Sequence, residues 1–290
     1  MHWFRLLRPA NILTAWADIV AGYAAAVALG GASWDAGAFP LLLLATTGLY
    51  GGGVVLNDVF DASLDSVERP ERPIPSGRVA RGHAALLGAA LLLSGVTAAA
   101  MVGPPAGRVA AAIAGLAVLY DARAKHHSAI GPLTMGLCRA GNLLLGAAVL
   151  PGVLASIWIL GALPLVYVAA ITLVSRGEVH GALRGAGALA LALVLAVVVG
   201  LLLVWRWTSN ESIRMLLFVA AFAAAVLPAF LKAATRPDPA TARAAVRAGV
   251  LCLVLLDASL AAGFAGWLPG LLTMTLLPLS MILARRFAVT

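Results

Sequence analysis

The chain is dominated by a series of long apolar segments, each close to the length that crosses a bilayer. A spanning helix needs about 20 mostly apolar residues, and somewhat fewer where flanking groups reach the interface. By that rule we predict nine helices, over residues 11–30, 38–56, 84–102, 108–121, 131–150, 157–175, 186–205, 213–231 and 246–266, and a weaker tenth over 268–284. We therefore expect an all-α polytopic transmembrane bundle that forms a single domain over residues 1–290.

The composition excludes a soluble globule. Hydrophobic residues make up 62% of the 290 residues and charged residues 11%, against about 45–50% and about 25% in soluble proteins. The net charge of +8 comes from short clusters between apolar segments, which is typical of topology signals and not of a nucleic-acid-binding surface.

Cys138 and Cys252 lie in separate apolar segments, so we expect packing roles and no disulfide or metal pair. The first segment lacks a convincing cleavage site and is predicted to remain as a signal-anchor.

The basic residues are distributed unequally between the two ends of the predicted helices. With the N-terminus in the cytoplasm, 16 of the 20 Lys and Arg residues fall at cytoplasmic ends and three at opposite ends. The positive-inside rule favours that orientation, and a tenth crossing would keep Arg285 and Arg286 on the cytoplasmic side. We expect a multi-pass protein of the bacterial plasma (inner) membrane, with acids and arginines gathered at its cytoplasmic face.

An acidic stretch follows the second predicted helix. Asn57, Asp61 and Asp65 are spaced i, i+4, i+8, which keeps them on one helical face, and Asp58 adds an overlapping stripe. Carboxylates this close repel one another, and a divalent cation relieves that repulsion. Oxygen ligands combined with phosphate oxygens and water suit Mg²⁺, so we predict a magnesium site here in preference to a solvated acidic loop.

A stiff, basic loop continues from the acidic stretch. Three prolines interrupt the helix, and Arg69 and Arg72 lie within reach of anything the aspartates hold. Metal on one side and guanidinium groups on the other would clamp a diphosphate. These arginines also serve as topology determinants, and the two interpretations are compatible.

The motifs together resemble the UbiA superfamily of membrane prenyltransferases, over essentially the whole chain. They are Arg8-Pro9-Ala10-Asn11, Asn57-Asp58-x-x-Asp61-x-x-x-Asp65, Arg72-Pro73-Ile74-Pro75-Ser76-Gly77 and Tyr120-x-x-x-x-Lys125. The resemblance implies about nine helices around a central cavity open to the cytoplasmic face. It also implies Mg²⁺-dependent transfer of an isoprenoid from a prenyl diphosphate to an acceptor, aromatic or otherwise small and polar. The matched positions imply metal-diphosphate binding by Asn57, Asp61 and Asp65, with Asn11, Arg72, Tyr120 and Lys125 contacting substrate.

The chain departs from the family at its second aspartate motif, which normally reads Asp-x-x-x-Asp after the sixth helix. Here Glu178 remains and Ala182 stands where the second acid is expected. We predict Glu178 as a further metal ligand, His180 as a ligand or general base, and Arg176 beside the same opening. The string Ser-Arg-Gly-Glu-Val-His-Gly resembles the EboC-like subgroup.

Three charged residues fall inside predicted helices, namely Asp18, Arg139 and Asp257. Such residues are costly in a bilayer and usually face the bundle interior or a cavity. We expect Arg139, with Asn142 near the same face, to contact either Asp18 or the diphosphate. We interpret Asp257 as a structural residue.

Two other functions compete with prenyl transfer. A CDP-alcohol phosphatidyltransferase also uses Mg²⁺ and membrane aspartates, but its characteristic Asp-Gly-x-x-Asp-Gly-Ala-Arg run is absent from the sequence. The altered second motif also allows a non-catalytic prenyl-lipid binding or transport component on the same scaffold.

Overall fold

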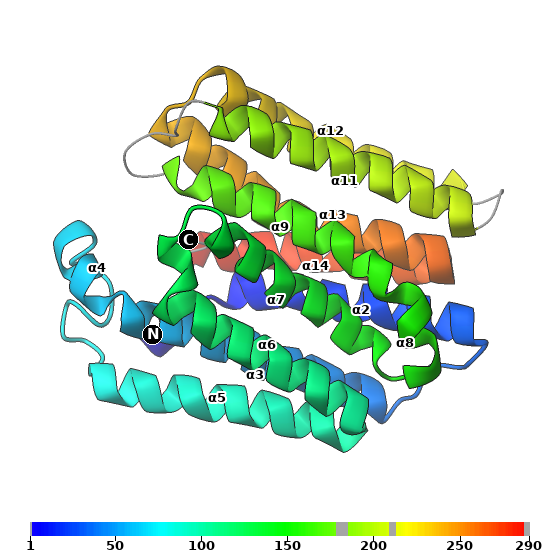
Figure 1. Cartoon of the computed structure of the whole chain (residues 1–290), viewed down its shortest axis with the longest axis horizontal. Coiled ribbons are helices and arrows are strands. Elements are labelled where there is room, and N and C mark those ends of the chain that lie inside the picture. The colour runs from blue at the N-terminus through cyan, green and yellow to red at the C-terminus, as the bar shows by residue number, and fades with distance from the viewer. Residues whose placement is uncertain (1, 178–184, 209–212, 287–290) are drawn as a thin grey trace.

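The computed structural model describes residues 2–177, 185–208 and 213–286, and these residues form a bundle of helices without a strand (Figure 1). The α-helices are α1 (His2–Leu7), α2 (Pro9–Gly30), α3 (Ala38–Phe60), α4 (Ala62–Glu68), α5 (Arg81–Val102), α6 (Pro104–Ala122), α7 (Ile130–Ala147), α8 (Pro151–Ile157), α9 (Ala162–Ser175), α11 (Ala186–Thr208), α12 (Ile213–Thr235), α13 (Pro239–Ala265) and α14 (Trp267–Arg286). Two 3₁₀ turns, η1 (Ala124–His126) and η2 (Trp158–Gly161), complete the described elements.

The helices pack side by side with their axes roughly aligned (Figure 1). Helix α2 contacts α7, α13, α14 and α3, and α7 also contacts α6 and α9. Helix α5 covers α3 on one flank, and α11 and α12 cover α9 and α13 on the other. Eight helical segments within the described part of the chain, Pro151–Ser175 among them, are long and apolar enough to cross a membrane. With α6 and α7, the ten predicted segments are all helical, so the predicted all-α bundle is confirmed.

Proline residues shift several helix boundaries from their predicted places. The Pro104-Pro105 pair opens α6, and Pro239 opens α13 behind an Asp238 N-cap whose carboxylate accepts a hydrogen bond from the Thr241 backbone N–H. Proline suits the first turn of a helix because its missing N–H has no intrahelical partner there. Pro151 likewise begins the short helix α8, so α7 ends earlier and α9 begins later than predicted.

Glycines allow α7 to approach its neighbours closely. A Cβ atom at Gly136 would lie 2.4 Å from the Leu165 carbonyl oxygen on α9, and one at Gly146 would lie 2.4 Å from the Ile19 carbonyl oxygen on α2. Small residues at such contacts let helix backbones approach within a bilayer. Helix α7 is thereby fixed between α2 and α9, which sets the position of its polar residues.

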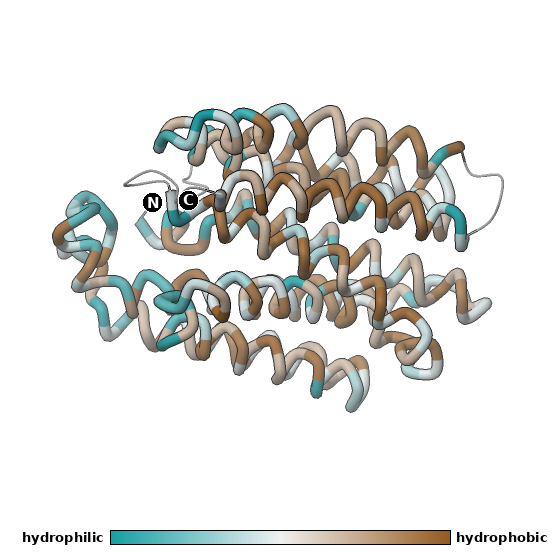
Figure 2. Tube along the Cα trace, turned by 45° about the horizontal axis from the view of Figure 1, so that its top comes forward, coloured by the Kyte–Doolittle hydropathy of each residue, from teal (hydrophilic) through white to brown (hydrophobic). Residues whose placement is uncertain are grey.

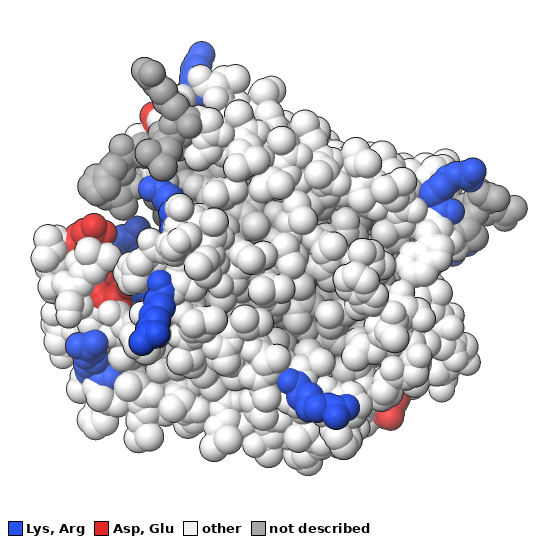
Figure 3. All heavy atoms as spheres, viewed as in Figure 1, with Lys and Arg blue, Asp and Glu red and all other residues white. Residues whose placement is uncertain are grey.

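Polar residues gather at the ends of the bundle and leave an apolar middle (Figure 2). Helix α4, both marked chain ends and most of the visible acidic and basic side chains lie at one end (Figures 1 and 3). We call this end of the molecule the charged rim, comprising Arg8, Asn57, Asp58, Asp61, Asp65, Glu68, Arg69, Arg72, Asp121 and Lys125.

Candidate functional site

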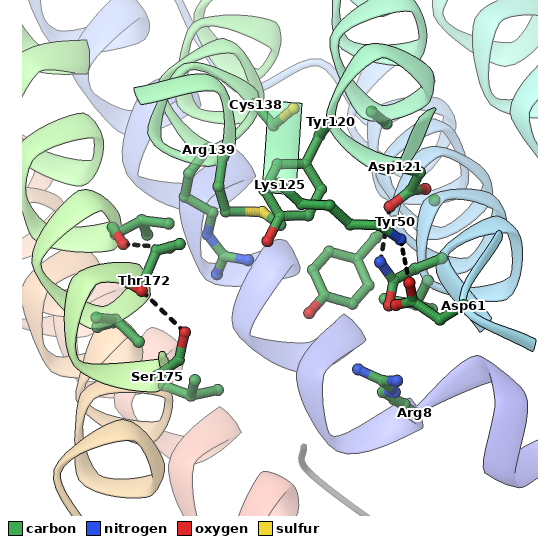
Figure 4. Close-up of a pocket in the computed structure, with 18 of the residues that line it drawn as sticks. Arg8, Tyr50, Asp61, Tyr120, Asp121, Lys125, Cys138, Arg139, Thr172 and Ser175 are labelled. Atoms are coloured by element: carbon green, nitrogen blue, oxygen red, sulfur yellow. Dashed lines mark hydrogen bonds and ion pairs between the residues drawn. The ribbon is translucent and has the colours of Figure 1, made fainter. Parts of the chain in front are cut away.

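A cavity of about 460 Å³ opens between helices α2, α3, α6, α7, α9 and α13. Its mouth is lined by rim residues such as Asp61, Asp65 and Arg69, and its inner part reaches Thr14 and Thr46. The α13 residues in the lining are apolar, α9 contributes Val168 and Ile171 together with Thr172 and Ser175, and polar groups also come from α2, α3 and α7. Figure 4 shows lining residues such as Tyr50, Asp121, Arg139 and Thr172, which come from separate helices, around the cavity.

The acidic stretch lies at a bend where α3 passes into α4. Helix α3 ends at Phe60, and Asp61 caps both helices. Helical backbone bonds continue through the bend, because the N–H of Asp61 donates to the Asn57 carbonyl and the N–H of Asp65 donates to the Asp61 carbonyl. The predicted i, i+4, i+8 face is therefore preserved, and Asn57, Asp61 and Asp65 all line the cavity.

The aspartates at the rim form ion pairs with basic residues from three parts of the chain. Lys125 Nζ lies 2.5 Å from Asp61 Oδ1, and Arg72 Nη1 lies 2.7 Å from Asp65 Oδ2. Asp58 Oδ1 accepts from Arg8 at 2.8 Å and from Arg72 at 3.3 Å. These pairs use one oxygen of each carboxylate and leave the other oxygen for further contacts.

Arg8 is a rim residue that the site prediction omitted. It caps α2 with φ 46° and ψ 61°, a left-handed conformation that is uncommon for a residue with a side chain. Strained backbone of this kind persists where surrounding contacts hold it, and here the ion pair with Asp58 does so. The sequence did point to Arg8, because it is the first residue of the motif Arg8-Pro9-Ala10-Asn11. Only Asn11 of that motif was predicted to contact substrate.

Asp121, at the end of α6, was also missed as a site residue. Its side chain is buried, lines the cavity, and accepts a hydrogen bond from Asn57 Nδ2 at 2.8 Å. Because the amide nitrogen of Asn57 is directed at Asp121, the amide oxygen is the atom left for a cation. The only sequence signal was an acid next to the motif tyrosine, Tyr120.

The segment between α6 and α7 is held in place by Arg176. Its Nη2 donates to the carbonyl oxygens of Lys125 at 3.0 Å and His127 at 2.8 Å. Arg176 therefore acts on the backbone that carries Lys125, and its side chain is not part of the cavity lining.

A buried polar cluster lies farther inside the bundle. Arg139 Nε lies 2.7 Å from Asp18 Oδ2, and Arg139 Nη2 donates to Thr14 Oγ1 at 2.9 Å. Asn142 Nδ2 donates to the same Asp18 oxygen at 2.8 Å and Thr46 Oγ1 donates to Asn142 Oδ1 at 2.6 Å. The predicted alternative of an Arg139–Asp18 pair is thus the one observed in the structure.

The predicted site residues divide into three groups by position. The cavity lining includes Asn57, Asp61, Asp65, Arg69, Arg72, Tyr120, Lys125, Arg139 and Asn142. Asn11, Asp58 and Arg176 lie outside the lining. Glu178 and His180 lie outside the described residues.

The rim fits a magnesium ion bound together with a diphosphate. Its donors are carboxylate and amide oxygens, which match the preference of Mg²⁺ for hard oxygen ligands. Within the described residues, no three acidic, histidine or cysteine side chains already surround one point, because Asp61 and Asp65 face Lys125 and Arg72. Mg²⁺ commonly takes only one or two carboxylates and completes its shell with phosphate oxygens and water, so Asp61, Asp65 and the Asn57 oxygen form an adequate set.

Comparisons with solved structures show a shared fold. A UbiA homologue from Aeropyrum pernix K1 superposes with a TM-score of 0.72 over 87% of this chain and 97% of that chain, at 17% identity. A UbiA homologue from Archaeoglobus fulgidus, with GPP and Mg²⁺ bound, gives a TM-score of 0.58 over 90% and 99% of the two chains, at 16% identity.

Sequence comparisons identify the family. A digeranylgeranylglyceryl phosphate synthase from Methanoregula boonei is 38% identical over 146 residues, a match that spans half of each protein. The EboC-like subgroup stays a prediction. Residues 16–246 match the model of the UbiA prenyltransferase family, and the chain therefore belongs to that family.

Proposed function

We propose that this protein is a Mg²⁺-dependent prenyltransferase that moves an isoprenoid group from a prenyl diphosphate to an acceptor. The observation that carries the proposal is the pairing of acids and bases at the mouth of an otherwise largely apolar cavity. Asp61 and Asp65 are positioned to hold the cation, and Arg72 and Lys125 to contact phosphate oxygens. We treat residues 1–290 as one catalytic domain.

The residues at the rim have different roles in the release of the diphosphate. When bound, Mg²⁺ supplies positive charge that stabilises the departing diphosphate. The Lys125 ammonium and the guanidinium groups of Arg69 and Arg72 add hydrogen-bond donors to phosphate oxygens. Asp58, bonded to both Arg8 and Arg72, holds those guanidinium groups toward the mouth. We therefore assign Asp58 a positioning role beside the metal site in place of direct ligation.

The apolar wall of the cavity suits an isoprenoid chain. Val168 and Ile171 on α9 line the cavity together with Val246, Val250 and Leu253 on α13. A dry surface of this kind protects an allylic cation from water. The chain would also reach this wall from the bilayer without crossing an aqueous layer.

The relatives support a prenyl donor and leave the acceptor open. A related protein is named digeranylgeranylglyceryl phosphate synthase, and a structural neighbour holds GPP and Mg²⁺. The protein is an integral membrane protein, and we place it in a bacterial plasma membrane with the charged rim at the cytoplasmic face. The excess of basic residues at that end supports this orientation.

Mg²⁺-dependent binding and turnover of geranyl diphosphate test the proposal. Asp61→Ala and Asp65→Ala should each abolish Mg²⁺-dependent binding in detergent while the purified protein stays folded. Glu71→Gln is the matched control, because Glu71 is an exposed acid near the rim outside the cavity lining. Unchanged affinity in either aspartate variant would reject the metal assignment. Binding without release of diphosphate under any acceptor condition would favour the non-catalytic lipid-binding function.

A further inference from the structure

Two acidic side chains, Asp18 on α2 and Asp257 on α13, lie together in the interior of the bundle. Asp18 is nine residues into α2, which is about 14 Å along the helix axis, and both side chains are completely buried. The Asp257 carboxyl group lies within hydrogen-bond reach of Asp18. Neither residue lines the cavity, so the pair lies behind the cavity wall and apart from the charged rim.

The charges of this pair do not balance if both acids are ionised. Arg139 on α7 is the one cation that the described part of the chain places against them, with its Nε 2.7 Å from Asp18 Oδ2. Two carboxylates beside one guanidinium would leave a negative charge without a partner. Such a charge is very costly inside a bilayer, and a buried carboxyl group in that position keeps a proton instead.

The other helices around the pair bring no second positive charge to it. Helices α3, α8, α9, α11, α12 and α14 pack on α2 or α13, and each either lacks charged residues or carries them near its ends. The nearest arginine along α13, Arg247, is ten residues from Asp257, or about 15 Å. The titratable side chains of this region outside the cluster are Tyr50, Tyr167 and Cys252, and phenols and thiols supply no positive charge.

The hydrogen bonds of the pair show where a donor is missing. Asp18 Oδ2 accepts from Arg139 Nε and from Asn142 Nδ2. Among the described residues, no donor reaches Asp18 Oδ1 or either oxygen of Asp257, and all three atoms are buried. A proton on Asp257 turns the contact between the two carboxyl groups into an O–H···O hydrogen bond and gives Asp18 Oδ1 its donor. Asp18, which already faces the guanidinium, stays the charged member of the pair.

We propose that Asp18 and Asp257 form a proton-binding site: they hold one proton between them, carried by Asp257, and this proton joins α2 to α13. Arg139, Asn142 and Thr14 line the cavity in front of the pair. Asp257 is therefore a positioning residue, because through Asp18 it holds the guanidinium group that Figure 4 shows beside the cavity. The site binds its proton whether or not the protein transfers a prenyl group.

Infrared spectroscopy of the purified protein detects this proton directly. The carbonyl stretch of a protonated carboxylic acid is separate from the carboxylate and amide bands, so the difference between wild type and Asp257→Asn at pH 7 should contain one acid band. Asp18→Asn should remove the same band, because Asp257 then pairs with Arg139 as a carboxylate. Asp35→Asn is the matched control and should leave the band in place, since Asp35 is exposed and its carboxylate accepts from two backbone N–H groups.

Thermal unfolding in detergent gives an independent measurement. Asp257→Asn is neutral and keeps a donor for Asp18, so at about pH 6 its melting temperature should lie within about 4 °C of wild type, the effect of exchanging one hydrogen bond. Asp257→Leu is also neutral but has no donor, and it should melt below Asp257→Asn. Unfolding exposes Asp257 to water, where an aspartate releases its proton at neutral pH. The wild-type melting temperature should therefore fall relative to Asp257→Asn as the pH is raised to about 9.

The alternatives give different results in the same measurements. If both acids are ionised, the difference spectrum contains no acid band, and Asp257→Asn raises the melting temperature by removing an unpaired charge; either result would overturn the proposal. A melting temperature that rises when NaCl replaces KCl, without an acid band, would assign the balancing charge to a bound sodium ion. None of these measurements uses geranyl diphosphate, so a failure here is distinct from a failure of the prenyltransferase function.

Discussion

Replacing Asp121 tests how the rim selects the oxygen of Asn57 for a cation. Asp121 Oδ1 accepts from Asn57 Nδ2 at 2.8 Å, and the Asp121 side chain is only 3% exposed. Asp121→Leu removes the acceptor and leaves the half-buried amide N–H of Asn57 without a partner, which costs at most about 1–3 kcal/mol. The Asn57 amide is then free to turn its nitrogen toward the cavity, and a nitrogen of this kind does not ligate Mg²⁺.

The expected result is a weaker response to Mg²⁺ with little change at saturation. Loss of a group that orients a metal ligand typically lowers metal affinity 10- to 100-fold. Asp121→Asn retains an acceptor oxygen and should fall between wild type and Asp121→Leu, because a hydrogen bond to a neutral group is about 1 kcal/mol weaker than one to a charged group. Isothermal titration of Mg²⁺ into protein in the presence of excess geranyl diphosphate measures the shift directly.

Two controls show whether a weaker Mg²⁺ response comes from a general loss of negative charge or from misfolding. Glu71→Gln removes an exposed acid near the rim and should leave the titration unchanged. The melting temperature of each variant shows whether folding is intact. If Asp121→Leu is folded and its Mg²⁺ half-saturation equals that of wild type, Asp121 does not orient Asn57 and the reasoning is wrong.

Three further predictions concern stability in detergent. Arg139→Met should destabilise the protein by about 3–5 kcal/mol by stranding buried Asp18, and the double variant with Asp18→Asn should recover part of the loss in thermal unfolding. Gly136→Ala should lower the melting temperature because its methyl group would meet the Leu165 carbonyl, whereas Gly115→Ala, where a Cβ meets nothing within 4 Å, should not. The Thr241 backbone N–H lowers the pKa of Asp238 from its usual 3.8, so this cap stabilises α13 at neutral pH and is lost as pH falls through the lowered pKa. The melting-temperature deficit of Asp238→Ala should accordingly be full at pH 7 and shrink below about pH 4.

The helices were predictable from the sequence because a bilayer imposes both a length and an apolar composition on each of them. Their ends were less predictable where proline occurs. The helices predicted to start at residues 108 and 246 begin earlier, at Pro104 and Pro239, since the missing N–H that breaks a helix interior suits its first turn.

The local spacing of the site residues could also be predicted from the sequence, but the contacts between distant parts of the chain could not. The spacing of Asn57, Asp61 and Asp65 follows from helical periodicity alone and survives the bend at Asp61. The partner of Asn57 is 64 residues away in Asp121, and Arg8 pairs with Asp58 across 50 residues. No local pattern predicts which side chains meet over such separations, because helix packing decides it.

Asp58 illustrates how the helical face decides between neighbouring acids. It was grouped with the metal ligands because it overlaps their stripe, yet it is one residue, or about 100°, around the helix from Asn57. That rotation directs its carboxylate toward Arg8 and Arg72 and takes it out of the cavity lining. We propose that a carboxylate in this position orients cations instead of binding the metal.

The ion pairs at the rim also explain how a charged site coexists with a dry cavity. A buried charge without a partner is far more costly than a paired one, and Asp61 and Asp65 are paired with Lys125 and Arg72. An incoming cation and diphosphate would exchange partners with these pairs: the carboxylates turn to the cation, and the ammonium and guanidinium groups turn to phosphate oxygens. Each charged group keeps an oppositely charged partner in that exchange. Binding therefore leaves neither aspartate without a neighbouring positive charge. Arg176 holds the backbone of Lys125 in place throughout, so the ammonium need only turn on its flexible side chain from Asp61 to the phosphate.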